Sequence, residues 1–375
     1  MKIIFHHPGN IGGKPSASAL RPKMMYSAFQ ENGYEVSLIT GGIHDRRKSI
    51  QSISRRMKEG EQFNFVYVEN SSSPMIYSAI RIFGKIVPIP VFSDFLFFLR
   101  CKAKKIPVGY FFRDIYWNFP ETFGENVSKK KRIVLKLFGH IELWFIKHFV
   151  TTVFVPNESF GEYLKDNYNI TCTPLPPGCV ISDADEMKEK ETEKENQING
   201  TPLKLFYVGG CGPVYNPRMF FEAMKDCKDF AELVYCTRKN EWLHYCSDIE
   251  VPSNVKVIFE SGERVAQEIH KSDVCVHTLP PTPYSKIAYP YKIAEYIGYG
   301  KPMIVFKGTH IAHLIDNNEI GFSATYTQES LVNLLRNISR SDELIHVIEK
   351  IKDYRHTQTW GNRIKLIASQ LSDTT

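Results

Sequence analysis

The chain has 375 residues, of which 43% are hydrophobic and 23% charged, and its formal net charge is +6. This composition excludes a disordered chain, and the length suffices for two domains with separate cores. The eight cysteines stand at positions 101, 172, 179, 211, 227, 236, 246 and 275. They form no C-x-x-C pair and no zinc-finger spacing with histidine, so reduced thiols are expected, with neither a disulfide framework nor a metal site.

The N-terminus and the most apolar segment decide what the sequence predicts about membranes. Residues 1–10 (MKIIFHHPGN) lack the longer apolar core of a secretory signal. Residues 75–101 are the most hydrophobic stretch, but charged side chains and prolines interrupt them. They therefore do not supply the roughly 20 mainly apolar residues of a spanning helix. We expect a cytoplasmic protein that does not cross a membrane.

In the first half of the chain, short β-rich runs alternate with helical segments. A strand at 2–7 is followed by a glycine-rich loop and a helix at about 18–32. Further strands are predicted at 35–40, 63–69, 108–113 and 152–156. Several of these runs are continuously apolar or aromatic, as expected for strands buried on both faces of a parallel sheet. The alternation predicts a doubly wound α/β domain.

A charged segment separates this half from a second one of the same kind. Residues 182–200 are rich in Glu and Lys and almost free of apolar side chains, which is typical of a solvated linker. Strands are then predicted at 203–208, 233–236, 255–259, 274–277 and 303–306. The pattern predicts two Rossmann-like α/β domains, at 1–178 and from 202 onward, with a charged linker at 179–201.

Two glycine-rich loops follow predicted strands and precede predicted helices. Open parallel sheets bind ligands beyond the carboxyl ends of their strands, and a helix N-terminus favours an anion. The first loop, 8–13 (PGNIGG), contributes Gly12 and Gly13 as candidate donor-binding residues. The second, 209–216 (GGCGPVYN), contributes Gly209 and Gly210, with Arg218 in the first turn of the next helix. In each case the alternative is an ordinary turn without a ligand.

The segment 289–302 (YPYKIAEYIGYGKP) is the most informative part of the sequence. Pro290 opens a predicted helix, and Tyr291, Lys292 and Glu295 lie in its first turns. Lys292 and Glu295 are three residues apart, so both can project from one face. The carboxylate can accept hydrogen bonds from sugar or ribose hydroxyls, and the ammonium can neutralise phosphate. The alternative is a surface ion pair of little energetic consequence.

From this segment onward the sequence resembles the two-domain nucleotide-sugar glycosyltransferases of the GT-B fold, in particular glycosyltransferase family 4. The resemblance rests on P-Y-K-x-x-E-Y-x-x-x-G-K-P-M-I at 290–304 and continues through HLIDNNEIGF at 313–322. Weaker similarity lies in KSDVCVHTLP (271–280), FRDIYWN (112–118), VPNESFGEYL (155–164), LPPGCV (175–180) and TWGNRIKLI (359–367). The resemblance implies a donor domain at 202–355 and a C-terminal helix, 356–375, that returns to the first domain.

The resemblance also implies roles for individual residues. Glu295 matches the second Glu of the family's E-x7-E pattern, which is associated with the ribose of the donor, whereas Ile287 occupies the place of the first. Candidates for the phosphate-binding cations are Arg218, Arg238 and Lys292. It further implies retention of anomeric configuration and no obligatory metal ion, because helix N-termini and fixed cations can stabilise the leaving diphosphate.

The first domain is expected to bind the acceptor. Asp114 follows a predicted strand, where it could serve as an acid or base facing the acceptor, or form a structural turn with Arg113. His6 and His7 end the first strand, and because adjacent strand residues point in opposite directions, at most one of them faces the site.

A cationic helix start suggests contact with a membrane surface. Lys129, Lys130, Lys131 and Arg132 begin a predicted amphipathic helix at 128–148, where their charge opposes the helix dipole. An anionic lipid surface would explain them, and the acceptor would then be lipid-linked. The alternative is a core-packing helix with a solvated end.

The function predicted from the sequence is transfer of a sugar from a UDP- or GDP-linked donor to a glycan or lipid-linked acceptor in bacterial cell-surface polysaccharide assembly. Two alternatives stay open: a catalytically silent GT-B-like partner subunit, and a nucleotide-sugar epimerase. A nucleic-acid partner is not expected, because the basic segments are local and no nucleic-acid-binding module is recognised. The expected location is cytoplasmic, peripheral at the inner face of the cell membrane.

Overall fold

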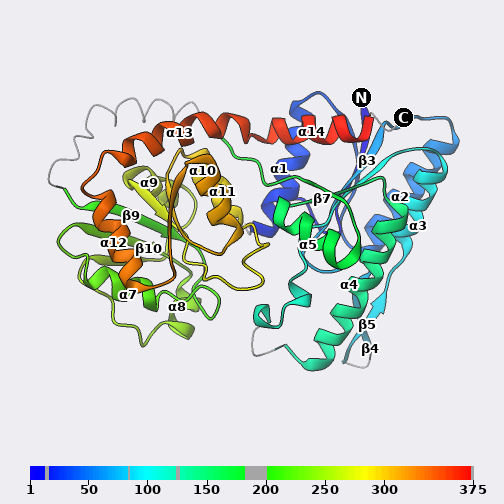
Figure 1. Cartoon of the computed structure of the whole chain (residues 1–375). Helices are drawn as coiled ribbons and strands as arrows, with labels where there is room; N and C mark the ends of the chain where they lie inside the picture. Colours follow the sequence, from blue (N-terminus) through cyan, green and yellow to red (C-terminus); the bar gives the residue numbers. More distant parts are fainter. Residues whose placement is uncertain (13–16, 83–84, 124–126, 182–200, 373–375) are drawn as a thin grey trace. The chain divides into compact units, whose positions relative to one another are not determined.

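The structure, a computed structural model, describes residues 1–12, 17–82, 85–123, 127–181 and 201–372 (Figure 1). It contains two compact units. The first comprises Met1–Pro177 together with the C-terminal segment from Trp360, and the second comprises Gly178–Thr359. Most of the linker expected at 179–201 lies outside the described residues. The C-terminal helix expected at 356–375 begins at Trp360, because residues 356–357 still belong to the preceding helix.

The first unit is built on six parallel strands in the order β2-β1-β3-β6-β7-β8. These are β1 (Lys2–His6), β2 (Glu35–Ile39), β3 (Phe65–Glu69), β6 (Val108–Phe111), β7 (Thr152–Val155) and β8 (Cys172–Pro174). β3 and β6 are buried along their whole length, as a parallel sheet covered on both faces requires. The winding direction changes between β1 and β3, so the topological switch point lies there.

Six α-helices and two short 3₁₀ helices surround this sheet in the described residues. They are α1 (Ala17–Glu31), α2 (Ile43–Lys58), α3 (Ser93–Ala103), η1 (Tyr116–Asn118), η2 (Pro120–Thr122), α4 (Lys129–Phe149), α5 (Glu158–Tyr168) and α14 (Trp360–Ser372). The C-terminal helix α14 packs against α1 and β6. A Cβ atom added at Gly109 of β6 would lie 2.7 Å from Leu371 of α14. Close packing therefore makes the C-terminal helix part of the first unit's core.

An antiparallel hairpin between β3 and α3 was not predicted. β4 (Tyr77–Ile82) and β5 (Lys85–Pro90) pair only with each other among the described strands. The prolines at 88 and 90 are compatible with this arrangement, because each strand of a two-stranded ribbon has a free edge. The apolar and basic segment that begins at Met75 is therefore divided between a hairpin and the helix α3.

The second unit repeats the doubly wound plan, with strand order β11-β10-β9-β12-β13-β14, all parallel. Its strands are β9 (Leu203–Val208), β10 (Ala231–Cys236), β11 (Val255–Ile258), β12 (Val274–Val276), β13 (Met303–Phe306) and β14 (Gly321–Ala324). Its helices are α7 (Arg218–Lys225), α8 (Lys239–Tyr245), α9 (Glu263–Lys271), α10 (Tyr291–Gly298), α11 (His310–Asn318), α12 (Gln328–Ile338) and α13 (Glu343–Thr357).

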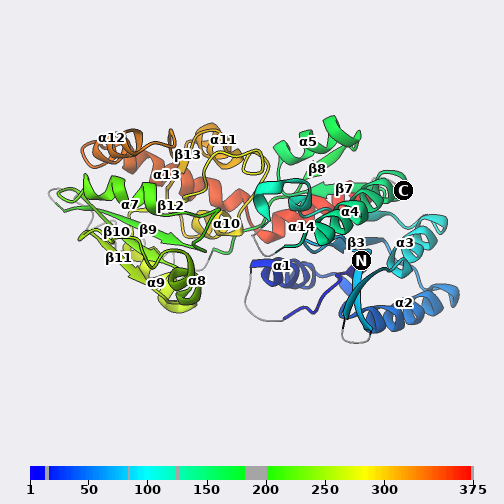
Figure 2. The same cartoon turned by 90° about the horizontal axis from the view of Figure 1, so that it is seen from below.

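Two separate apolar clusters cover the two faces of this second sheet. One includes Phe220 of α7 and Leu335 of α12, and the other includes Ile293 of α10 and Ile315 of α11. Figure 2 shows α7 and α12 on one side of the strands and α9 on the other. The predicted doubly wound α/β architecture is thus confirmed for both halves of the chain.

The prediction missed the edge strands β8 and β14. Both are short, and their sequences, CTP and GFSA, contain residues with weak strand preference. Each pairs along one side only, with β7 and β13 respectively. Pairing with an existing strand, rather than local propensity, therefore decides that these segments are strands.

Helix α4 is anchored to the first unit by a buried glycine and a buried carboxylate. Gly139 lies so close to the Trp117 ring that an added Cβ atom would overlap it. Glu142, fully buried, accepts hydrogen bonds from Asn70 Nδ2 (2.6 Å), the Met75 backbone N–H (2.5 Å) and the Tyr110 hydroxyl (2.7 Å). Burial raises the pKa of Glu142 to about 7, against the lowering effect of these three donors. One face of α4 is thus fixed to the unit's core.

We expect Gly139→Ala to destabilise the first unit, because the new methyl group displaces the Trp117 ring. Overpacking of this kind costs about 1–3 kcal/mol in free energy of unfolding, more than the gain in helix propensity. The control is Gly161→Ala in α5, where an added Cβ atom meets neighbours only at 3.5–3.6 Å. Urea unfolding followed by tryptophan fluorescence measures both, and equal stability of the two variants would contradict the prediction.

Candidate functional site

The second unit gathers polar groups at the carboxyl ends of its strands. Gly209 follows β9, Thr237 and Arg238 follow β10, and Glu260 and Ser261 follow β11. The winding of the sheet reverses between β9 and β12, which are neighbours in space. In open α/β sheets a crevice for ligands forms at this reversal, outside the carboxyl ends of the strands. The fold therefore places a binding site at these loops.

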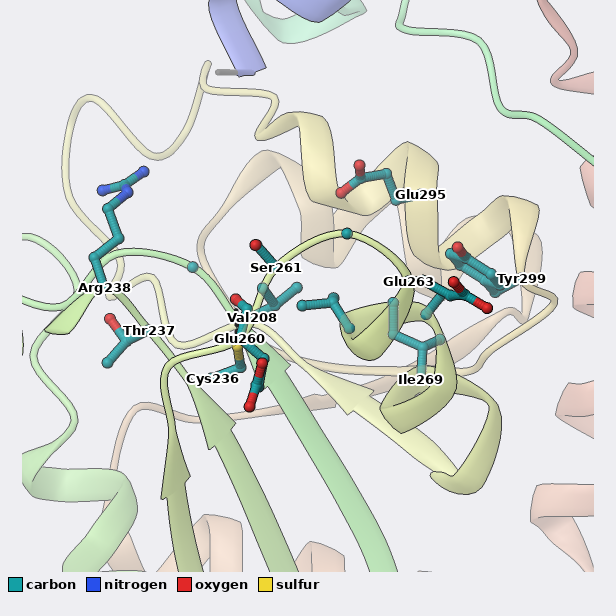
Figure 3. Close-up of a pocket in the computed structure, with 14 residues that line it drawn as sticks. Val208, Cys236, Thr237, Arg238, Glu260, Ser261, Glu263, Ile269, Glu295 and Tyr299 are labelled. Carbon is teal, nitrogen blue, oxygen red and sulfur yellow. Dashed lines mark hydrogen bonds between the residues drawn. The ribbon is translucent and has the colours of Figure 1, made fainter. Parts of the chain in front are cut away.

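A cavity of about 590 Å³ lies at this edge of the sheet (Figure 3). Its size falls within the range of small-molecule and cofactor sites. Its lining comes from the ends of β9, β10 and β11 and from α9 and α10: Val208, Gly209, Cys236, Thr237, Arg238, Glu260, Ser261, Gly262, Glu263, Val265, Ala266, Ile269, Glu295 and Tyr299. The lining combines apolar side chains with charged and hydroxyl-bearing ones.

Helix α10 carries two of the predicted site residues and is firmly positioned. Pro290, with φ −66°, stands at its N-cap, and Tyr291 is its first residue. The buried face of α10 includes Ile293 and Tyr296, and the Tyr296 hydroxyl accepts a hydrogen bond of 3.1 Å from the Val208 backbone N–H. The second half of α10 is therefore tied to the end of β9, beside the cavity.

The Nζ atom of Lys292 is buried at this point without a hydrogen-bond acceptor among the residues that the structure describes. Its Nζ atom lies 4.2 Å from the centre of the Tyr207 ring and 4.9 Å from that of Tyr215. A Cβ atom at Gly209 would collide with it, so the glycine makes room for the ammonium group. Burial lowers the pKa of Lys292 to about 7. The charge of Glu295 acts to raise this pKa, whereas the charge of Arg238 lowers it further.

Other polar groups near Lys292 also lack partners within the described part of the chain. Both ring nitrogens of His277, after β12, are buried without a hydrogen bond, as is Thr237 Oγ1 after β10. Burial and the charge of Lys292 lower the pKa of His277 well below its usual value, so this imidazole is neutral. Buried polar groups are almost always hydrogen-bonded, and a cluster of unsatisfied ones at a crevice indicates a place for a ligand.

Glu295 and Arg238 flank the same cavity. In Figure 3 Ser261 lies between these two side chains, which come from α10 and from the loop after β10. Burial raises the pKa of Glu295, and the Lys292 charge opposes that change. Arg238 is ion-paired with Glu241 in the next helix, and Gly210 lies beside this pair. The structure therefore brings together Gly209, Lys292, Glu295 and Arg238.

Arg218 does not join this group. Its guanidinium forms an exposed ion pair of 2.6 Å with Asp248, and it is not among the residues that line the cavity. Conversely, sequence reasoning missed Glu260, Ser261 and Glu263. The signal was present, because the segment FESGE follows β11 directly and opens α9, with Gly262 at the helix N-cap in a positive-φ conformation of +61°.

The site residues predicted in the first domain lie in the first unit. Asp114, just beyond β6, accepts a hydrogen bond of 2.9 Å from the Tyr116 backbone N–H, so it shapes the turn into η1. Gly12 has φ +97° and no neighbour within 4 Å of an added Cβ atom. Gly13 lies outside the described residues.

His6 ends β1 and His7 follows it directly. Both side chains are buried in the first unit. His6 Nε2 lies 2.7 Å from Asp94 Oδ1, and Asp94 also accepts hydrogen bonds from Arg46. His7 Nδ1 lies 2.7 Å from the Glu69 carbonyl oxygen.

The cations predicted to dock on a membrane form the start of α4. Ser128 caps the helix by accepting a hydrogen bond from the Lys131 backbone N–H (3.3 Å), and Arg132 lies over the Phe123 ring. Lys129, Lys130 and Lys131 are exposed. Throughout the described chain, no helix combines the length and apolar character of a candidate membrane span. The described residues also contain no group of His, Cys, Asp and Glu placed to hold a metal ion.

We expect Lys292→Met to stabilise the protein, and more so at pH 6 than at pH 9. The pKa of Lys292 is about 7 when folded and 10.5 when unfolded. Between these values the unfolded chain binds a proton that the folded chain does not, so wild-type stability rises with pH. The cost of burying the charge is therefore greatest below pH 7, and methionine removes it.

Thermal unfolding of Lys292→Met and of Lys286→Met, an exposed lysine in the same unit, provides the measurement and its control. A gain for Lys292→Met that is the same at both pH values would show that its pKa is not lowered.

No protein-family model and no curated protein sequence matches the chain. Solved structures match it over its whole length. HepE from Anabaena in complex with UDP is 12% identical at a TM-score of 0.64, covering 100% of both chains. A glycosyltransferase from Rickettsia africae is 12% identical at 0.63, covering 100% of this chain and 98% of that one. WaaG, a glycosyltransferase involved in lipopolysaccharide biosynthesis, is 15% identical at 0.57, covering 99% of each. The chain therefore has the GT-B fold of these glycosyltransferases.

Proposed function

We propose that the chain is a glycosyltransferase that binds a UDP- or GDP-linked sugar in its second unit and transfers the sugar to an acceptor hydroxyl. The observation that carries the proposal is the buried Lys292 ammonium group. It has no hydrogen-bond acceptor in the described structure, and it lies against Gly209, at the start of α10 and beside a 590 Å³ cavity.

The diphosphate of the donor fits the surroundings of Lys292. An anion there would receive hydrogen bonds from the ammonium group, and it would lie at the N-terminus of α10, where the helix dipole favours negative charge. Its charge would also raise the pKa of Lys292, so binding and protonation would support each other. As the sugar bond breaks, negative charge accumulates on the leaving diphosphate, and a cation fixed in a site of low polarity stabilises that charge strongly. The proposal needs no obligatory metal ion for this step.

The nucleoside fits the adjoining cavity. Glu295 can accept hydrogen bonds from ribose hydroxyls, and charged hydrogen bonds of this kind are stronger than neutral ones. Arg238, Ser261 and the loop after β11 provide further polar contacts around the cavity. Structures of HepE contain UDP or UDP-glucose, which supports a nucleotide-sugar donor for a chain of the same fold.

The acceptor is proposed to be a glycan or a lipid-linked sugar in bacterial cell-surface polysaccharide assembly, and the anomeric configuration is proposed to be retained. Support comes from the resemblance of residues 290–304 to a retaining family and from the fold shared with WaaG, which acts in lipopolysaccharide biosynthesis. Asp114 belongs to the proposed acceptor side, and the glycine-rich loop that contains Gly12 and Gly13 is proposed to contact the donor from the first unit. A cytoplasmic location fits the cytoplasmic supply of nucleotide sugars.

A docking surface for anionic lipid is the second part of the proposal. Beyond its cationic first turn, α4 exposes Ile133 (67%), Leu137 (55%) and Trp144 (57%). These positions are four and seven residues apart, so they form one stripe along the helix. An exposed apolar stripe beside lysines is typical of helices that lie in a lipid interface. This surface would hold the enzyme where a lipid-linked acceptor is present.

We expect Lys292→Met and Glu295→Gln each to weaken nucleotide binding or donor turnover at least tenfold while the protein stays folded. The first substitution removes the charge opposite the diphosphate, and the second removes the anionic partner of the ribose. Thermal-shift titration against UDP, GDP and ADP in EDTA, followed by donor turnover, measures both. A ligand at a hundredfold excess over its dissociation constant stabilises the folded protein by about 2.7 kcal/mol.

Lys286→Met and Glu329→Gln are the matched controls, since both side chains are exposed in the same unit. Wild-type kinetics in Lys292→Met or Glu295→Gln would remove that residue from the site. Nucleotide binding without any donor turnover would favour a catalytically silent subunit.

We expect replacement of Lys129, Lys130, Lys131 and Arg132 by glutamine to weaken binding to vesicles that contain phosphatidylglycerol. Each cation near an anionic membrane contributes about 1 kcal/mol to binding. The control replaces four exposed cations of α2 in the same unit, which are Arg47, Lys48, Arg55 and Lys58. Vesicle sedimentation that is equally weakened in both variants would indicate a general charge effect rather than docking through α4.

A further inference from the structure

His7 lies at the topological switch point of the first unit's sheet. It directly follows β1, and its ring contacts the end of β3, the neighbouring strand on the other side of the reversal. Ligands of doubly wound sheets bind at this place. The glycine-rich loop begins two residues later, at Gly9. The proposed donor site in the second unit makes no use of this histidine.

Hydrogen bonding fixes the tautomer of His7. Its Nδ1 atom lies 2.7 Å from the backbone carbonyl oxygen of Glu69, and a carbonyl oxygen only accepts. Nδ1 therefore carries the hydrogen, and Nε2 presents a lone pair. The described residues give His7 no second hydrogen bond, so this lone pair is available to a ligand.

The surroundings also keep the ring neutral. Burial lowers the pKa of His7 to about 4, and the nearby charges of His6, Arg113 and Arg46 act in the same direction, against the hydrogen bond to Glu69. A neutral imidazole accepts a hydrogen bond at Nε2 throughout the physiological pH range. Because its basicity is low, it orients a hydroxyl group rather than removing the proton. Its lone pair also repels phosphate oxygens, which carry no hydrogen to donate.

Gly9 leaves Nε2 uncovered. A Cβ atom at this position would lie 3.0 Å from Nε2, where a hydrogen-bonded ligand atom would be. The loop is held in place, since the Gly9 carbonyl oxygen accepts a 2.9 Å hydrogen bond from the Gly41 backbone N–H. His6 differs: it has no exposed surface and is bound to Asp94, whereas His7 retains 5% exposure.

We propose that His7 Nε2 accepts a hydrogen bond from a hydroxyl group of the acceptor sugar and thereby orients the acceptor for transfer. This inference rests on the proposed function, because it assumes that the first unit binds a sugar acceptor. His7 is then an acceptor-binding residue, and Gly9 is the residue that gives the acceptor access to it.

Two substitutions test the proposal from opposite sides of the contact. His7→Asn retains a donor to the Glu69 carbonyl oxygen but removes the acceptor at Nε2. Gly9→Ala leaves His7 unchanged and fills the space beside Nε2 with a methyl group. The controls are His44→Asn, an exposed histidine, and Gly161→Ala, whose methyl group makes only ordinary contacts. If the role of His7 were purely structural, Gly9→Ala would leave the affinity for glycosides unchanged.

Binding of octyl β-D-glucoside, octyl β-D-galactoside and octyl α-D-mannoside, below their micelle concentrations, is measured by calorimetry with and without UDP. We expect at least one glycoside to bind about three- to tenfold more weakly to His7→Asn, as for a lost neutral hydrogen bond, and at least tenfold more weakly to Gly9→Ala. The controls keep wild-type affinity, and UDP affinity is unchanged in all variants.

Nitrogen NMR of the wild-type histidines reports the tautomer directly, with Nδ1–H expected for His7 between pH 6 and 8. An Nε2–H tautomer, absence of glycoside binding, or equal affinity in all variants would overturn the proposal. If the proposed donor site is wrong, UDP fails to bind the wild-type protein. The glycoside measurements without UDP still decide the role of His7 in that case.

Discussion

The candidate site in the second unit is dominated by the free-energy cost of burying one ammonium group. Lys292 is surrounded by the Tyr207 and Tyr215 rings and by the backbone at Gly209, and no carboxylate or carbonyl oxygen in the described residues accepts a hydrogen bond from it. An isolated charge in such surroundings destabilises the folded state, as the lowered pKa of Lys292 indicates. We propose that the diphosphate of a donor removes that cost. Relief of the unfavourable burial would then contribute to the free energy of donor binding.

The first unit pairs its buried carboxylates with hydrogen-bond donors. Asp94 accepts from Arg46 and contacts His6, Glu69 accepts a hydrogen bond from Arg21, and Glu142 has three donors. Buried carboxylates that are satisfied in this way make a rigid frame. Within that frame His7 has one nitrogen bound and the other open beside Gly9. We propose that a cation binds phosphate in the second unit and that a neutral hydrogen-bond acceptor binds a hydroxyl group in the first.

Much of the fold could be predicted because buried parallel strands have a distinctive sequence pattern. β9 and β13 were predicted to the residue, since these mainly apolar runs end at glycine or a charged residue. The hairpin β4–β5 and the edge strands β8 and β14 were missed, because their formation depends on a partner strand rather than on local preference. The same limit applied at the site. Lys292 and Glu295 could be selected from their spacing, but the placement of Arg218 with Asp248 depends on distant segments.

The sequence by itself determined two doubly wound halves, the loops that follow their strands and the residue types available there. The spacing of apolar residues and the presence of turn-forming residues are local properties, so they can be recognised from neighbouring positions in the sequence. Only the tertiary structure decided which of these residues are buried together, that Lys292 lacks a partner, and that His7 is held by Glu69. Burial and pairing set the charge state and the hydrogen-bonding direction of a side chain, and both depend on segments far apart in the chain. Chemistry at the two sites is for that reason a property of the fold.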